Sequence, residues 1–177
     1  MPEVTLYIAI SLDGYIADSN GDVDWLSKVE IADEDYGYHD FYQSVDALVM
    51  GNKTYRQILQ FGDWPYTEKP CWIYTHDIKQ PAEPLIHFTS ETPTSLLLQM
   101  EQNNYQHIWL VGGADIMHQF QSENLITRYI ISIIPIILGN GISLFSHEAS
   151  QHSLTLLSSK HYQSGLVQLH YRHDNSD

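Results

Sequence analysis

Short apolar runs, rich in β-branched and aromatic residues, alternate along the chain with polar segments of helical length. Runs of this kind without glycine or proline predict buried strands, and we expect them at residues 4–10, 47–50, 71–75, 85–88, 107–111 and 127–134. The segments between them predict helices at 33–44, 53–59, 92–102 and 114–121. Thr92 and Pro93 suit the cap and first turn of the third helix. Two final stretches, 154–162 and 165–172, predict an antiparallel pair joined by a turn.

Strands that alternate with helices favour a mostly parallel sheet covered by helices on both faces. The closing pair adds an antiparallel hairpin to that sheet. Neither a repeat nor a low-complexity linker interrupts the 177 residues. We therefore predict one α/β domain over 1–177, with three layers (α/β/α) and a mostly parallel central sheet that ends in an antiparallel hairpin.

A long connection follows the first predicted strand. Residues 11–24 contain Asp13-Gly14 and Asn20-Gly21, which are typical of turns, and Trp25 and Leu26 end the segment. Loops of this length inside a compact domain are often functional lids.

The charge of the chain limits its partners. Its formal net charge of −14 opposes binding to nucleic acid and to anionic membranes, and the longest apolar run, 129–138, is too short to span a bilayer. We expect a small-molecule partner. Half of the eight basic residues lie between positions 53 and 79. This cluster is either a solvated face or a local phosphate site; its members are Lys53, Arg56, Lys69 and Lys79.

The cysteine content indicates a reducing compartment. Cys71 is the only cysteine, so the chain forms no internal disulfide. We expect it to be a buried structural residue. The N-terminus has no basic stretch followed by an apolar one, and we expect the protein to be cytoplasmic.

Two glycine turns are the main candidates for ligand binding. Gly51 follows one predicted strand and Gly112-Gly113 follows another, each just before a helix. The first turn of a helix has unpaired N–H groups that favour phosphate, and glycine lets a ligand approach the backbone. Each turn alone also fits an ordinary strand–helix connection. Because open α/β sheets bind ligands at the carboxyl ends of their strands, the two turns together predict one cleft for an extended anionic cofactor.

Other common site motifs are absent. The chain has no phosphate-binding G-x-x-x-x-G-K-[ST] loop, no G-x-S-x-G elbow and no H-E-x-x-H zinc motif. Its ten histidines show no repeated ligand spacing, so we predict no metal site.

Four segments, taken in order, resemble the dihydrofolate-reductase-like superfamily. They are 7–17, 48–55, 108–114 and 135–145. The similarity is closest to the stand-alone relatives of the bacterial riboflavin-biosynthesis reductase domain. The resemblance implies the dihydrofolate-reductase-like form of the predicted fold, NADPH as cofactor and hydride transfer to a pterin or a ribosylamino-pyrimidine. A non-catalytic nucleotide-binding or regulatory protein on the same scaffold is the alternative.

The resemblance also implies roles for individual residues. Ala9 and Ile16 would flank the nicotinamide, beneath the 11–25 loop. The cofactor phosphates would be held by Gly51, Asn52, Lys53 and Thr54, and the adenosine ribose would lie near Thr75 and His76. The pyrophosphate would contact Val111, Gly112, Gly113, Ala114, Asp115 and Ile116. Trp25 and Tyr55 would lie on the substrate side.

The choice between NADPH and NADH stays open at this point. Lys53 and Lys79 are candidates to meet the 2′-phosphate of NADPH, but Asn52 stands where the family often has an arginine. Lysine is a flexible point charge and does not supply the rigid fork of arginine.

A carboxylate on the first helix of dihydrofolate reductases binds the pterin, and Asp35 is similar to it in position. A buried carboxylate there would orient a pyrimidine-like ring and assist protonation. The chain lacks the cysteine pairs of a zinc deaminase domain. Arg128 and Lys28 are among the few cations left for a phosphorylated substrate. The resemblance further implies a homodimer formed through the 129–138 strand and the terminal hairpin.

Overall fold

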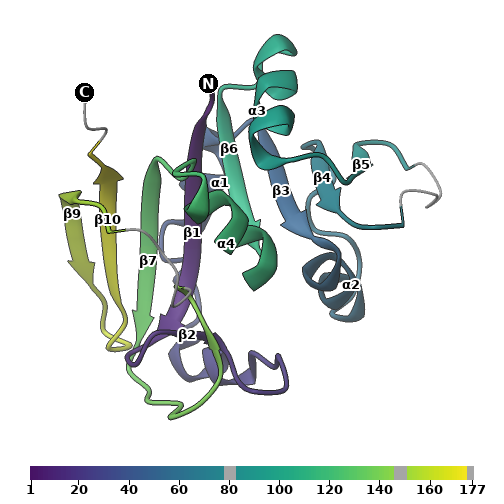
Figure 1. The fold of residues 1–177 in the computed structure, drawn as a ribbon. Helices are drawn as coiled ribbons and strands as arrows, with labels where there is room; N and C mark the ends of the chain where they lie inside the picture. The colour runs from purple at the N-terminus through teal and green to yellow at the C-terminus, as the bar shows by residue number, and fades with distance from the viewer. Residues whose placement is uncertain (78–82, 146–150, 175–177) are drawn as a thin grey trace.

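The structure is a computed structural model that describes residues 1–77, 83–145 and 151–174. Its main sheet has eight strands in the order β5-β4-β3-β6-β1-β7-β10-β9 (Figure 1). These strands are β1 (Glu3–Ser11), β3 (Ala47–Gly51), β4 (Cys71–Tyr74), β5 (Ile86–Thr89), β6 (His107–Gly112), β7 (Arg128–Ile134), β9 (Leu154–His161) and β10 (Val167–His173). A small second sheet pairs β2 (Tyr15–Ala17) with β8 (Ile142–Ser143). The helices are η1 (Asp24–Val29, 3-10), α1 (Tyr38–Ser44), α2 (Asn52–Gln60), α3 (Pro93–Gln102) and α4 (Ala114–Ser122).

The central part of the sheet is parallel, as predicted. β1 pairs in parallel with β6 on one side and with β7 on the other. β10 pairs antiparallel with β7 and with β9, which forms the predicted closing hairpin. Val4 and Leu6 of β1 are completely buried, because a central parallel strand is covered on both faces.

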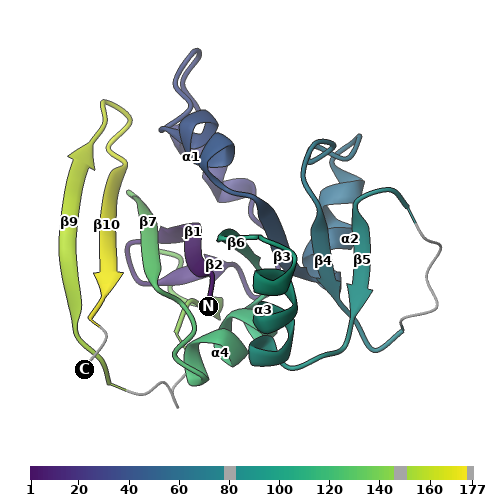
Figure 2. The same cartoon turned by 90° about the horizontal axis from the view of Figure 1, so that it is seen from above.

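Helices cover both faces of the sheet, as Figure 2 shows: α3 and α4 lie on one side, α1 and α2 on the other. The side with α3 and α4 holds the larger core, which includes Leu97 and Phe120. The side with α1 and α2 holds a second core, which includes Cys71. Burial raises the pKa of the Cys71 thiol far above its usual range, so it is an inert structural residue, as expected.

The helix predicted at 33–44 is shorter than expected. It starts at Tyr38, and the preceding residues form turns. Asp33 and Tyr36 have φ values of 64° and 57°, and Gly37 has 80°. Left-handed residues cannot continue a right-handed helix, which is the reason for the error. By contrast, α3 starts as predicted, with Pro93 at its beginning and the Thr92 side chain accepting a hydrogen bond from Ser95 N.

The 11–24 connection has more structure than its sequence indicates. It contains β2, which pairs with β8 from a segment more than 120 residues later. The Asp13 carboxylate accepts hydrogen bonds from Leu138 N (3.1 Å) and Gly139 N (2.7 Å). A Cβ at Gly141 would overlap the Ala17 carbonyl oxygen. The predicted lid is therefore fastened to residues 138–143.

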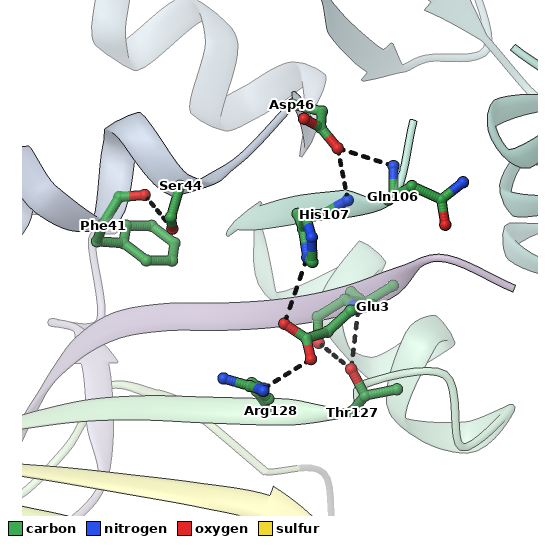
Figure 3. A network of polar contacts seen from close by, with 9 residues as sticks. Glu3, Phe41, Ser44, Asp46, Gln106, His107, Thr127 and Arg128 are labelled. Atoms are coloured by element: carbon green, nitrogen blue, oxygen red, sulfur yellow. Dashed lines mark hydrogen bonds and ion pairs between the residues drawn. The ribbon is translucent and has the colours of Figure 1, made fainter. Parts of the chain in front are cut away.

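Polar contacts join β1, β6 and β7 at their amino-terminal ends (Figure 3). The Asp46 carboxylate accepts from Gln106 N and His107 N, each at 2.8 Å. Glu3 forms an ion pair with Arg128 (2.7 Å), and its carboxylate also lies 3.6 Å from His107 Nδ1. Arg128 therefore lies at the amino-terminal ends of the strands. The glycine turns lie at the carboxyl-terminal ends, so Arg128 is too far away to contact a substrate bound beside them. None of the helices in the three described ranges is long and apolar enough to cross a membrane.

Candidate cofactor and substrate site

The two glycine turns touch each other. β3 and β6 are neighbours, so their carboxyl ends bring Gly51 next to Gly112-Gly113. A Cβ built on Gly113 would lie 3.1 Å from Thr54 Oγ1 and 3.5 Å from Gly51 Cα. Gly113 also has a φ of +91°, a conformation that favours glycine. The two glycine turns thus lie side by side, as predicted, and a side chain at Gly113 would fill the space between them.

The helices that follow both turns begin without a side-chain cap. The N-cap residues of α2 and α4 are Gly51 and Gly113, which have no side chain to accept from the first-turn amides. Such amides and the helix dipole favour an anion. Lys53 and Asp115 project from the two first turns, with Nζ 3.9 Å from Oδ2 and both side chains exposed. The edge therefore offers amides, one cation and one carboxylate.

Asn52 supports the same assignment. Its Oδ1 is buried, and no hydrogen-bond donor reaches it among the described residues. A buried acceptor without a donor is costly, and a ribose hydroxyl or an amide of a ligand would satisfy it. The donor set around Gly51 and Gly113 therefore fits a dinucleotide, with phosphates on the amides and hydroxyls near Asn52.

The residues expected near the adenosine lie just beyond β4. Thr75 N donates to Thr89 O (2.9 Å), and Thr75 Oγ1 accepts from Asp77 N (3.1 Å). The neighbouring His76 is exposed. β4 is next to β3, so both residues lie along the same edge as Gly51. Lys79 lies outside the described residues.

A cavity of about 770 Å³ lies beside this edge. One wall consists of strand residues, among them Tyr7, Ala9, Trp109 and Ser132, and the other of residues between positions 26 and 38. Ile8, between Tyr7 and Ala9 on β1, also belongs to the cavity lining, and its Cδ1 lies 4.0 Å from a Cβ built on Gly112. Ala9 thus lines the cavity, whereas Ile16 packs against the larger core.

Asp35 lies at the rim of the cavity and differs from the expectation. It precedes α1 and its side chain is exposed, not buried. Oδ1 accepts from Gly37 N (2.9 Å) and Oδ2 from His39 N (3.0 Å). These bonds, the His39 amide first, lower the pKa of Asp35 below its usual value. The carboxylate therefore stays ionised at neutral pH, which suits it to accept a hydrogen bond from a ligand.

The two residues expected on the substrate side have different surroundings. Tyr55 does not line the cavity; its buried ring packs against Trp64 (5.2 Å between centroids) and Phe88 (5.8 Å). That expectation is corrected, because the α2 helix turns Tyr55 towards the second core. Trp25 and Ala9 both pack against a third cluster, which includes the cavity residues Val29 and Ile134. Its indole Nε1 is buried without a partner among the described residues.

Several residues in the cavity wall, and two that contact it, were not found from the sequence. Gln168 Nε2 donates to Ser132 Oγ (3.1 Å) and to Tyr36 O (3.2 Å), and Gln168 Oε1 faces His170 Nε2 (3.0 Å). Burial raises the pKa of Tyr7 to about 12, so its hydroxyl stays protonated. The only sequence signal was Ser132 inside the apolar strand β7, because Gln168 and His170 belong to a strand with polar residues at alternate positions.

The chain is similar to known proteins over nearly its whole length. The sequence model of the RibD C-terminal domain matches residues 2–168. The chain belongs to the RibD C-terminal domain family. This family is associated with the reductase of riboflavin biosynthesis. The uncharacterized Bacillus subtilis protein YwjB is 36% identical over 170 residues, which cover 96% of this chain and 97% of that protein.

Solved structures support the same fold. A putative riboflavin biosynthesis protein from Shewanella sp. PV-4 is 29% identical, with a TM-score of 0.90, and the match covers 98% of this chain and 99% of that one. The diaminohydroxyphosphoribosylaminopyrimidine deaminase/5-amino-6-(5-phosphoribosylamino)uracil reductase of Thermotoga maritima is 16% identical, with a TM-score of 0.75. The match covers 97% of this chain and 56% of that one. This RibD-family chain has the dihydrofolate-reductase-like fold that the four sequence segments implied.

Proposed function

We propose that this RibD-family protein is an NADPH-dependent reductase that transfers a hydride to a small molecule with a planar, nitrogen-containing ring. The observation that carries the proposal is the contact between the Gly51–Thr54 turn and Gly113, beside a cavity lined by aromatic residues. An edge for an extended anionic cofactor next to a cavity for a flat molecule is the arrangement that hydride transfer needs.

Each part of the site has a distinct task in this proposal. The first-turn amides of α2 and α4 and the Lys53 ammonium hold the cofactor phosphates, and Asn52 Oδ1 accepts from a hydroxyl or an amide. Ala9 lies where the nicotinamide meets the substrate cavity. When bound, NADPH supplies the hydride. Tyr7 and Trp109 flank the cavity, exclude water and keep the substrate ring in one plane.

The charges around the cavity favour an unphosphorylated substrate. Glu30, Glu34 and Asp35 line its rim, and no lysine or arginine is among its described lining residues. Carboxylates repel a phosphate and accept hydrogen bonds from ring amino groups. Of the two substrate classes that the resemblance implies, a pterin or another unphosphorylated aminopyrimidine ring therefore fits better than a phosphoribosyl compound.

Cofactor oxidation tests the proposal. The protein is mixed with NADPH and, in turn, with dihydropterin, aminopyrimidine and simple carbonyl acceptors, and the nicotinamide absorbance is followed. We expect oxidation that depends on one class of acceptor. Binding of NADPH without turnover of any acceptor would support the alternative, a non-catalytic nucleotide-binding protein on this scaffold.

A further inference from the structure

Ser132 is a buried polar residue on the wall of the cavity. It lies in the middle of β7, opposite Ala9 of β1 and Gln168 of β10. Its exposed fraction is 6%, yet it belongs to the cavity lining. Buried hydroxyl groups normally use their hydrogen-bonding capacity, and the neighbours of Ser132 fix the direction of each of its bonds.

The Tyr36 carbonyl determines how the Gln168 amide is oriented. A carbonyl oxygen only accepts hydrogen bonds, so the Gln168 atom 3.2 Å from Tyr36 O must be the NH₂ nitrogen. The same nitrogen lies 3.1 Å from Ser132 Oγ. Its two hydrogens are therefore used on Tyr36 and Ser132, and Ser132 is the acceptor in the second bond.

The carbonyl end of the Gln168 side chain determines which ring nitrogen of His170 carries a hydrogen. Gln168 Oε1 can only accept, so His170 Nε2, at 3.0 Å, carries the hydrogen between them. Gln168 is 4% exposed, and both ends of its amide now have partners. The direction of donation runs from His170 through Gln168 to Ser132.

In this series of hydrogen bonds, the hydroxyl hydrogen of Ser132 has no acceptor. Ser132 accepts from Gln168, and among the residues described no acceptor for its own hydrogen is present. We infer that Ser132 donates a hydrogen bond to a carbonyl oxygen of the molecule bound in the cavity. Gln168 and His170 act as positioning residues that keep Ser132 in this donor state. The inference rests on the proposed function only in that the cavity is the substrate site.

The rim of the cavity, opposite Ser132, is acidic. Asp35 is held ionised at the rim, where Glu30 and Glu34 also lie. A hydroxyl donor inside and carboxylate acceptors outside suit a flat ring with an acceptor on its inner edge and amino groups on its outer edge. An amino-substituted pyrimidinone ring has this pattern.

Two commercial compounds test the role of Ser132 in the full-length protein. 2,6-Diaminopyrimidin-4-one and 2,4-diaminopyrimidine differ by one carbonyl oxygen, and their dissociation constants are measured by calorimetry without cofactor. We expect the wild-type protein to prefer the carbonyl compound. Ser132→Ala should reduce this preference roughly ten-fold, the value of one hydrogen bond in a site without water. Ser132→Thr keeps the hydroxyl and should retain the preference.

Gln168→Glu tests whether Gln168 keeps Ser132 in its donor state. A carboxylate only accepts, so Ser132 would turn its hydrogen towards position 168 and away from the ligand. We expect the same loss of preference as in Ser132→Ala, and no further loss in the double variant. General loosening of the cavity would weaken both compounds equally and leave their ratio unchanged. If Ser132→Ala does not fold, Ser132→Cys, with a weak donor of similar size, is measured in its place.

An unchanged ratio in Ser132→Ala, or no binding of either compound to the wild-type protein, would overturn the inference. Neither result concerns cofactor oxidation, which is measured separately. If the protein oxidises NADPH but Ser132→Ala leaves the compound preference unchanged, the proposed function stands and this inference fails. If the wild-type protein prefers the carbonyl compound and Ser132→Ala loses that preference, but no acceptor is turned over, this inference stands and the proposed function fails.

Discussion

At the scale of single residues, the site depends on backbone that comes very close together. Gly113 would place a Cβ 3.1 Å from Thr54 Oγ1 at a φ of +91°. Both the strain and the contact fall on the proposed phosphate edge. Few other positions in the described chain combine these two properties, which makes Gly113 the sharpest test of that edge.

Gly113→Ala should abolish or strongly weaken cofactor binding and should lower the free energy of unfolding by about 1–3 kcal/mol. Gly62→Ala is the matched control, because Gly62 has a φ of +138° with nothing within 4 Å of the added Cβ. It should lose stability and still bind NADPH, as measured by thermal melting and nicotinamide fluorescence. Normal cofactor binding by Gly113→Ala would exclude this edge as the phosphate site.

Lys53→Ala should weaken binding of NADPH more than binding of NADH, since only NADPH carries the additional phosphate. Arg56→Ala is the control, because Arg56 is an exposed basic residue on the same helix. Asp115→Asn should have the opposite effect and tighten NADPH binding, because Asp115 Oδ2 lies 3.9 Å from the Lys53 ammonium. Equal losses for both cofactors in Lys53→Ala would remove Lys53 from the role.

Asp35→Asn should lower turnover of amino-bearing acceptors and leave NADPH affinity nearly unchanged. The amide would replace the carboxylate that, in the proposed function, accepts from the substrate. Hydrogen bonds hold the pKa of Asp35 below its usual value. The contribution of its carboxylate to turnover is therefore present above about pH 4 and is lost as the pH falls through the lowered pKa. Steady-state kinetics near neutral pH should therefore show no titration from Asp35. A pH dependence near pH 6–7 that disappears in Asp35→Asn would contradict this.

At the scale of elements, pairings distant in sequence changed two predictions. The 11–24 segment reads as a free lid, but β2 within it pairs with β8. The 33–44 segment reads as one helix, but left-handed residues at 33, 36 and 37 delay α1 to Tyr38. The turns that replace its first part form one wall of the cavity. Local propensity predicted neither, because each depends on contacts with a remote segment.

Asp13→Ala should loosen the fastening of the 11–24 segment, since the Asp13 carboxylate accepts from Leu138 N and Gly139 N. We expect faster limited proteolysis within 11–24 and weaker cofactor binding. Asp22→Ala is the control, because Asp22 is an exposed residue of the same segment. The hydrogen bond from Ser11, followed by these backbone bonds, lowers the pKa of Asp13, so the fastening is present at neutral pH and is lost as the pH falls through that lowered pKa. Equal proteolysis of the wild-type protein and Asp13→Ala would show that Asp13 does not hold the segment.

At the scale of the whole molecule, one edge of the sheet is open. Every residue of β9 is exposed, and its leucines are 37–51% exposed. Open apolar edge strands promote association. We propose that a second copy of the chain covers β9 and β10, in line with the dimer that the family resemblance implies.

Leu157→Lys should convert this dimer to a monomer, because it places a charge on the apolar edge. Leu98→Lys is the control, since Leu98 on α3 is similarly exposed, at 45% against 47% for Leu157. Light scattering after size-exclusion chromatography gives the mass of each variant. A monomeric wild-type protein would reject the proposed interface.

The sequence by itself determined the strand–helix order, the closing hairpin, the α3 cap and both glycine turns, because each is set by residues adjacent in the chain. The four family segments added the fold and the expected cofactor edge. Tertiary structure alone decided that Gly51 touches Gly113, that Tyr55 faces the core and that Arg128 lies at the far edge. It also decided that Asp35 is exposed and that Ser132, Gln168 and His170 form one chain across two strands. These features depend on which strands become neighbours and which face each side chain takes, and sequence periodicity does not specify strand order.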